Sequence, residues 1–145
     1  MSVPANQGGS LEFVGTSNIL QHYVAISNEL SHPQILTCPA DNNRKRTTNF
    51  LTLSTKNLSY FVGLDADETD WRMILSGDRN ITTNGRLMSG MLTLTKTSPA
   101  SWTKDLHGHC GNIGLSGGSA QQATDITLKS AVSNSPNLPA RLAIP

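Results

Sequence analysis

The chain is short of charged, aromatic and cysteine residues. Of its 145 residues, 14% are charged and 5% are aromatic, and the formal net charge is +1. With so little net charge, the chain has no strong positive electrostatic field, which argues against a protein that binds nucleic acid or anionic membranes through a basic surface. The chain also lacks an apolar run long enough to span a membrane, and no apolar signal-peptide core follows Met1. We therefore expect a soluble chain of one domain, with residues 1–10 as a flexible linker and residues 11–145 as the globular part.

The two cysteines, Cys38 and Cys110, are far apart in the sequence. They form no CxxC pair, which excludes the usual cysteine zinc sites and thioredoxin-type redox centres. Two interpretations remain open. One is a disulfide between Cys38 and Cys110, which would require an exported protein, and the other is two free thiols.

The clearest helix signal lies near the N-terminus. Apolar residues from Ile19 to Leu30 recur at spacings of three and four, which is typical of one buried helix face. Thr16 or Ser17 can cap this helix, and Pro33 ends it. A second, short helix is expected after Ser119, which forms a capping box with Gln122. Thr124, Leu128 and Val132 would share one face of this helix.

The remaining ordered segments are typical of β-strands. Asn84-Gly85 is a turn signal before one of them, and the last is expected at a sheet edge. The strands do not alternate regularly with helices, which disfavours a parallel sheet. The fold class predicted is α+β, with one N-terminal helix packed on an antiparallel sheet and a short C-terminal helix. The predicted strands are residues 35–38, 58–64, 72–76, 87–95, 112–116 and 141–144.

Several sequence blocks resemble one known family. NELSHPQILTCPAD (residues 28–41), NLSYFVGLDA (57–66) and LSGDRNI (75–81) are similar to stretches of type II secretion pseudopilin-like proteins. His107 is followed by nine residues and then by Gly117-Gly118, which resembles the H-x9-DG signature of these prepilin-associated proteins. The blocks occur in the family's order from residue 28 to residue 145.

The resemblance implies a pilin-like fold and a structural role. The chain would be the head domain of a type II secretion pseudopilus or type IV pilus-like filament, in the periplasm or at the cell surface. Its partners would be other pseudopilin subunits and the secretion machinery, and it would not be an enzyme. Contact with the membrane would come only through an N-terminal helix, which this sequence lacks.

Two features depart from the family pattern. Gly117 stands where the family has aspartate, although glycine still permits a tight turn. The family's N-terminal cleavage site and the long apolar helix that starts Phe-Thr-Leu-Ile-Glu are missing. We therefore expect the chain to be a truncated ectodomain.

Two clusters of side chains could bind a metal ion. Asp65, Asp67 and Asp70 lie in an acidic turn, for which a solvated loop is favoured over a calcium site because the EF-hand spacing is absent. Calcium is a cofactor candidate because pseudopilin heads of related type bind it in a loop. His107, His109 and Cys110 could ligate a transition metal, although a polar loop explains them more simply.

Two other functions compete with the structural role. A binding module for carbohydrate or a secreted partner would need exposed aromatic side chains, for which Trp71 and Trp102 are the candidates. A metal-dependent hydrolase would need His107 and His109 around an ion. The sequence has neither a G-x-S-x-G elbow nor a phosphate-binding loop, so we expect no enzyme.

Overall fold

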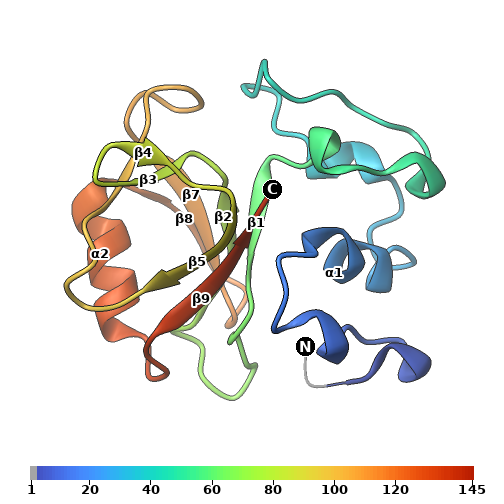
Figure 1. The fold of residues 1–145 in the computed structure, drawn as a ribbon, viewed down its shortest axis with the longest axis horizontal. Helices are drawn as coiled ribbons and strands as arrows, with labels where there is room; N and C mark the ends of the chain where they lie inside the picture. Colours follow the sequence, from blue (N-terminus) through green and yellow to red (C-terminus); the bar gives the residue numbers. More distant parts are fainter. Residues whose placement is uncertain (1–2) are drawn as a thin grey trace.

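The computed structural model describes residues 3–145 and shows an α+β fold (Figure 1). Two sheets form, one of six strands in the order β5-β9-β1-β2-β7-β8 and one of three strands in the order β4-β3-β6, and every strand pairing is antiparallel. The helices are α1 (Ile19–Ala25) and α2 (Asp125–Asn134). The strands are β1 (Tyr60–Gly63), β2 (Ile74–Asp78), β3 (Ile81–Thr83), β4 (Arg86–Leu87), β5 (Gly90–Leu94), β6 (Ala100–Trp102), β7 (Gly111–Leu115), β8 (Ala120–Ala123) and β9 (Ala140–Ile144).

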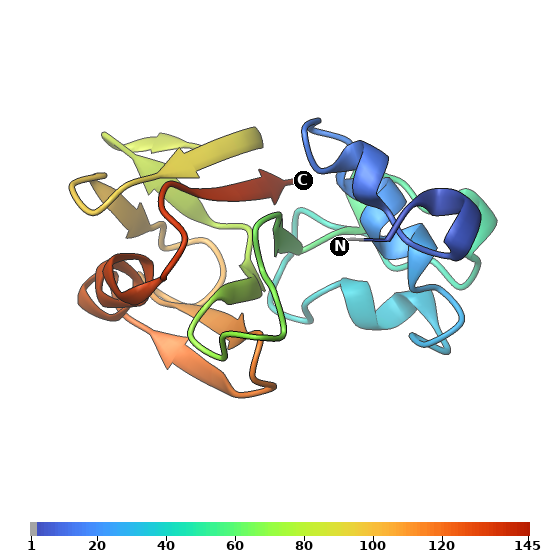
Figure 2. The same ribbon diagram turned by 90° about the horizontal axis from the view of Figure 1, so that it is seen from below.

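The two helices lie on opposite sides of β1 and β9 (Figures 1 and 2). Successive side chains of a strand point to opposite faces of the sheet. Phe61 of β1 therefore joins the core under α2, whereas Val62 joins the core formed with α1. Leu142 and Ala143 of β9 divide between the two cores in the same way. The six-stranded sheet thus has one apolar face toward each helix.

The N-terminal helix is shorter than predicted. Ile19 and Tyr23 are buried as the spacing indicates, but α1 ends at Ala25 and turns follow. Val24 and Ile26 are 42% and 44% exposed, so the apolar pattern continues past the segment that the core can cover. The cap is also different: Asn18 precedes α1, and neither Thr16 nor Ser17 caps it.

The strand predicted at residues 35–38 is wrong. A 3-10 helix, Pro33–Leu36, occupies this position. Proline suits the first position of a helix because its ring fixes φ and its missing N–H needs no partner there. Leu36 is 4% exposed and fixes this turn in the same core as α1.

The strand predicted at residues 87–95 divides between the two sheets. Asn84 and Gly85 both have positive φ, 52° and 74°, so the predicted turn is confirmed and joins β3 to β4. Gly90, with φ of 77°, redirects the chain into β5, which pairs with β9. Because β1 pairs with the other side of β9, the predicted edge strand is internal.

The second helix begins later than predicted. Ser119 and Gln122 do not form a capping box, because residues 120–123 pair as β8 with β7. The Thr124 side chain accepts a hydrogen bond from Thr127 N and starts α2 instead. Leu128 and Val132 share the inner face of α2 and are buried, whereas Thr124, predicted on the same face, is the exposed N-cap.

The predicted linker folds back on the following turn. Leu11 N donates to Val3 O, and Ser10 is buried. Residues 1 and 2 of that linker lie outside the described residues. Within residues 3–145, neither helix has the length and apolar character needed to cross a membrane.

Candidate functional site

Three polar side chains from distant segments converge beside the end of β2. Cys38 Sγ lies 3.6 Å from His107 Nε2, and that nitrogen lies 3.4 Å from Asp78 Oδ2. All three ligand atoms lie within 4.8 Å of one another. In residues 3–145 this is the only group of three or more metal-ligating side chains brought so close together. We refer to Cys38, Asp78 and His107 as the Cys-Asp-His cluster.

Backbone contacts fix the first two members of the cluster. Cys38 begins a turn in which its carbonyl accepts a hydrogen bond of 3.0 Å from Asp41 N. Asp78 ends β2, where it is paired with Tyr60 of β1. The amide and side-chain nitrogens of Asn112 donate to Asp78 Oδ2 at 2.6 Å and 2.9 Å. The carboxylate orientation is therefore set by β7.

His107 lies in the loop that connects β6 to β7. Asn80 is fully buried, and its Nδ2 donates to the carbonyl oxygens of Thr103 and Cys110, at the two ends of this loop. Leu106, near the middle of the loop, is buried and anchors the loop to the rest of the domain. The His107 side chain retains 25% exposure, so the cluster is accessible from solvent.

The carboxylate of Asp78 is in an unfavourable environment. It is fully buried, and its Oδ1 has no hydrogen-bond partner among residues 3–145. Burial raises the pKa of Asp78, although hydrogen bonds from Asn112 and the charge of His107 oppose this. Burial, with Cys38 and Asp78 nearby, also raises the pKa of Tyr60 to about 12, so its hydroxyl is neutral. The cluster therefore contains a buried acid with little compensating positive charge.

The arrangement does not resemble a thiol-hydrolase triad. In such a triad, the nucleophile and the acid face opposite nitrogens of the histidine, so that the acid fixes the tautomer. Here Cys38 Sγ and Asp78 Oδ2 both approach Nε2 of His107. Convergence of three donor atoms on one point is the arrangement of a metal site.

A buried ion pair lies next to the cluster. Arg79 donates to both carboxylate oxygens of Asp41, and Ser59 Oγ donates to Oδ2. Burial favours a higher pKa for Asp41, but the hydrogen bonds from Arg79 and Ser59 outweigh it and hold the pKa below its usual value. The pair connects the segment around residue 41 with the end of β2.

Of the two interpretations left open for the cysteines, the structure has the free thiols, and it separates His107 from His109 and Cys110. Cys38 and Cys110 are both free thiols in the structure, so no disulfide joins them. His109 is exposed and has a φ of 63°, which turns the chain after His107. Neither His109 nor Cys110 belongs to the cluster.

The acidic turn does not gather its carboxylates into a calcium site. Asp65 accepts hydrogen bonds from the backbone and side chain of Arg141. Asp70 pairs with Arg72, and Asp67 accepts from the backbone of Thr69. Each carboxylate is thus directed toward a different partner.

Gly117 and Gly118 lie in a tight turn after β7, as their sequence predicts. Gly118 has a φ of 84° and its N–H bonds to Leu115 O. A Cβ on Gly117 would lie 2.6 Å from the Cβ of Trp71, so these two residues touch closely.

The two tryptophans differ in exposure: Trp71 is 65% exposed, whereas Trp102 is 3% exposed in the core. The two indoles therefore form no shared platform for a sugar.

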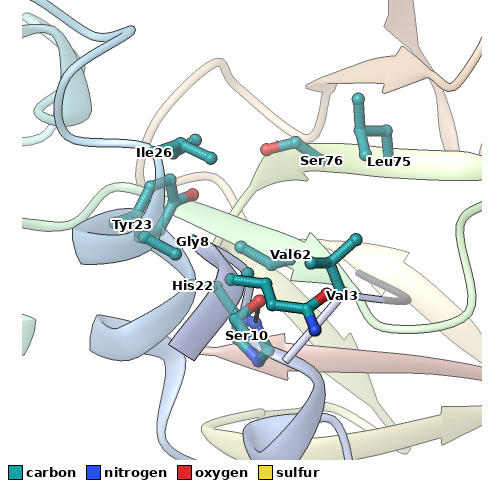
Figure 3. A pocket seen from close by; sticks show the side chains of 12 residues that line it. Val3, Gly8, Ser10, His22, Tyr23, Ile26, Val62, Leu75 and Ser76 are labelled. Atoms are coloured by element: carbon teal, nitrogen blue, oxygen red, sulfur yellow. Dashed lines mark hydrogen bonds between the residues drawn. The ribbon is translucent and has the colours of Figure 1, made fainter. Parts of the chain in front are cut away.

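An apolar pocket lies between α1 and strands β1 and β2 (Figure 3). Its volume is about 640 Å³, and Tyr23, Val62 and Leu75 line it. At one side, His22 Nδ1 and Ser10 Oγ are 2.8 Å apart. His22 Nε2 has no hydrogen-bond partner in residues 3–145, so no carboxylate orients the imidazole as a catalytic base would require.

Comparisons with family models, curated proteins and solved structures found no match in any of the three.

Proposed function

We propose that the chain is a structural subunit, the head domain of a type II secretion pseudopilus or type IV pilus-like filament. It would be displayed in the periplasm or at the cell surface and would contact other pseudopilin subunits and the secretion machinery. A pilin-like arrangement fits the position of α1, which packs Ile19 and Tyr23 against the β1–β9 face of the antiparallel sheet. Tyr23 also donates a hydrogen bond to Tyr60 O of β1.

One observation carries the proposal: three of the blocks that resemble the pseudopilin family each contribute a side chain to one buried, hydrogen-bonded cluster. Asp41 comes from the first block, Ser59 from the second and Arg79 from the third. These side chains are hydrogen-bonded to one another and almost fully buried. Residues buried in this way hold segments together and do not contact a substrate. The resemblance therefore coincides with the residues that build the domain, as expected of a structural subunit.

The side chains with catalytic potential also favour a structural role. Cys38 and Asp78 share one nitrogen of His107, and the Ser10–His22 pair has no orienting acid in the described part of the chain. General-base catalysis depends on an oriented base next to its nucleophile. The geometry thus supports a protein that acts through its surfaces.

The test uses the full-length native protein in the bacterium that encodes it. A pilin-type subunit is cut by the prepilin peptidase before it enters a filament. Deleting that peptidase should leave a larger, unprocessed protein and should remove it from the surface material released by shearing. An unrelated exported protein serves as the control for envelope damage. A protein whose size and location do not change in the deletion strain would contradict the proposal.

A further inference from the structure

We propose that Cys38, Asp78 and His107 bind one divalent transition-metal ion with the preferences of zinc. The ion would join the segment after Pro33–Leu36, the end of β2 and the β6–β7 loop. This proposal is independent of the filament role, because it rests on the positions of three side chains and not on the family resemblance.

The spacing of the donor atoms fits a tetrahedral ion. Zinc bonds of about 2.0 Å to nitrogen or oxygen and 2.3 Å to sulfur place neighbouring ligands roughly 3.3–3.6 Å apart. The observed Sγ–Nε2 and Nε2–Oδ2 distances are 3.6 Å and 3.4 Å. The remaining pair, Cys38 Sγ and the Asp78 carboxylate, lies within 4.8 Å, so one ion can contact all three residues after a small adjustment of their side chains.

The distance between His107 and Asp78 fits poorly to a direct hydrogen bond, whereas the 3.6 Å contact between Cys38 and His107 is within the range of a hydrogen bond to sulfur. An N–H···O bond is normally 2.7–3.2 Å long, and a bond between charged partners is shorter still. The 3.4 Å contact between His107 and Asp78 exceeds this range. Buried acids elsewhere in the domain achieve shorter contacts, as Asp41 does with Arg79 at 2.7 Å. The members of the cluster are thus spaced as co-ligands of an ion.

The buried carboxylate provides a second, independent observation. Asp78 is 0% exposed and its Oδ1 has no partner in residues 3–145. A buried carboxylate needs positive charge or hydrogen bonds to both oxygens. A divalent cation bound at Oδ2, the oxygen nearest His107, supplies that charge to the carboxylate, whose Oδ1 has no hydrogen bond of its own within the described chain. Asn112, which donates twice to Oδ2, then acts as the outer ligand that fixes the carboxylate.

The donor set selects the class of ion. Thiolate and imidazole are soft or borderline ligands, which favour zinc and related transition metals over calcium and magnesium. Three protein ligands leave the fourth position to water, which can enter beside the partly exposed His107. Binding requires loss of the thiol proton from Cys38, so the affinity should increase with pH.

The test is metal binding by the purified chain. The protein is stripped with a chelator and titrated with Zn²⁺ or Co²⁺, and bound metal is measured by elemental analysis after gel filtration. We expect one ion per chain, a higher melting temperature with Zn²⁺, and a thiolate-to-cobalt charge-transfer band with Co²⁺. Folded protein that retains no stoichiometric metal and shows no such band would overturn the proposal.

Matched variants locate the site. His107→Gln and Cys38→Ser should each weaken Zn²⁺ binding by at least about 100-fold, because each removes a direct ligand, whereas Asn112→Ala should weaken it about 10- to 100-fold. His109→Gln and Cys110→Ser change the neighbouring histidine and the other thiol and should leave binding unchanged. Circular dichroism of each metal-free variant checks its fold. Loss of binding in His109→Gln or Cys110→Ser, with retention in His107→Gln, would overturn the assignment.

Discussion

Arg79 donates two parallel hydrogen bonds to the carboxylate of Asp41, from Nε to Oδ2 and from Nη2 to Oδ1, each 2.7 Å long. The side chains of the two residues are 7% and 1% exposed. Ser59 adds a third hydrogen bond to the same carboxylate. Asp41 lies at the start of the long segment that leads to β1, and this pair attaches the segment to the end of β2.

Breaking this pair should strongly destabilise the domain. Arg79→Met leaves the Asp41 carboxylate buried without its partner, which typically costs about 3–5 kcal/mol. The double variant Arg79→Met with Asp41→Leu removes both charges and should recover much of that loss. Urea unfolding followed by circular dichroism measures both. Arg72→Met, which breaks the exposed pair with Asp70, is the matched control and should change stability little. Equal effects of Arg79→Met and Arg72→Met would contradict the expectation.

Gly117 packs so closely against Trp71 that no side chain fits at residue 117. An added Cβ at residue 117 would lie 2.6 Å from Trp71 Cβ and 3.2 Å from its Cα. Gly117→Ala should therefore cost about 1–3 kcal/mol through overpacking. The aspartate found here in the family that the chain resembles would meet the same obstacle. Thermal unfolding of the single variant measures the cost.

A second substitution tests whether the contact itself is the cause. Trp71→Gly removes the opposing Cβ, so adding Gly117→Ala to that background should cost clearly less than in the wild type. Gly114→Ala is the control within the same strand region, because a Cβ there meets only an ordinary contact of 3.9 Å. Additive costs of the two changes would show that Trp71 is not the obstacle.

The predicted elements that were confirmed have strong local signals. The Asn84-Gly85 turn follows from two residues that tolerate positive φ, and both adopt it. Leu128 and Val132 follow from helical spacing, and both are buried. The α+β class with antiparallel strands follows from the order of such segments.

Predictions failed where tertiary contacts override local pattern. The apolar spacing continues beyond Ala25, but α1 ends there, and Ile26 after it is 44% exposed. Ser119 and Gln122 have the spacing of a capping box, yet residues 120–123 pair with β7 as a strand. Strands β3 and β6 were not predicted, because three residues are too few to show a period.

The Cys-Asp-His cluster could not be derived from spacing. Tertiary contacts bring these residues together: the Asp41–Arg79 pair attaches the segment of Cys38 to the end of β2, and Asn80 holds the β6–β7 loop of His107. The sequence marks His107 as a candidate ligand, but it groups His107 with the adjacent His109 and Cys110 and not with Cys38 and Asp78. The chain turns with positive φ at residues 108 and 109, and His109 is consequently exposed.

His22 should make stability depend on pH on the acidic side of neutrality. Burial lowers the pKa of His22 below 6.5. The folded state therefore favours the neutral ring, and its contribution is present above the unfolded pKa and lost as the pH falls through the folded pKa. His22→Asn, which can still bond Ser10, should flatten the fall in unfolding free energy between about pH 7 and pH 5. The exposed His32→Asn is the control and should keep the wild-type slope. Identical slopes in all three proteins would exclude this role.

Asp78→Asn should have opposite effects in metal-free and zinc-containing protein. The amide oxygen can still accept the hydrogen bonds from Asn112, and the buried charge is removed. The metal-free variant should therefore be as stable as the wild type or more stable by about 1–3 kcal/mol. With Zn²⁺ the wild type should gain stability and the variant should not, because a neutral amide is a poor zinc ligand. Asp67→Asn, an exposed carboxylate remote from the cluster, should retain the wild-type response to Zn²⁺. An equal rise in melting temperature for wild type and Asp78→Asn would mean that Asp78 does not ligate the ion.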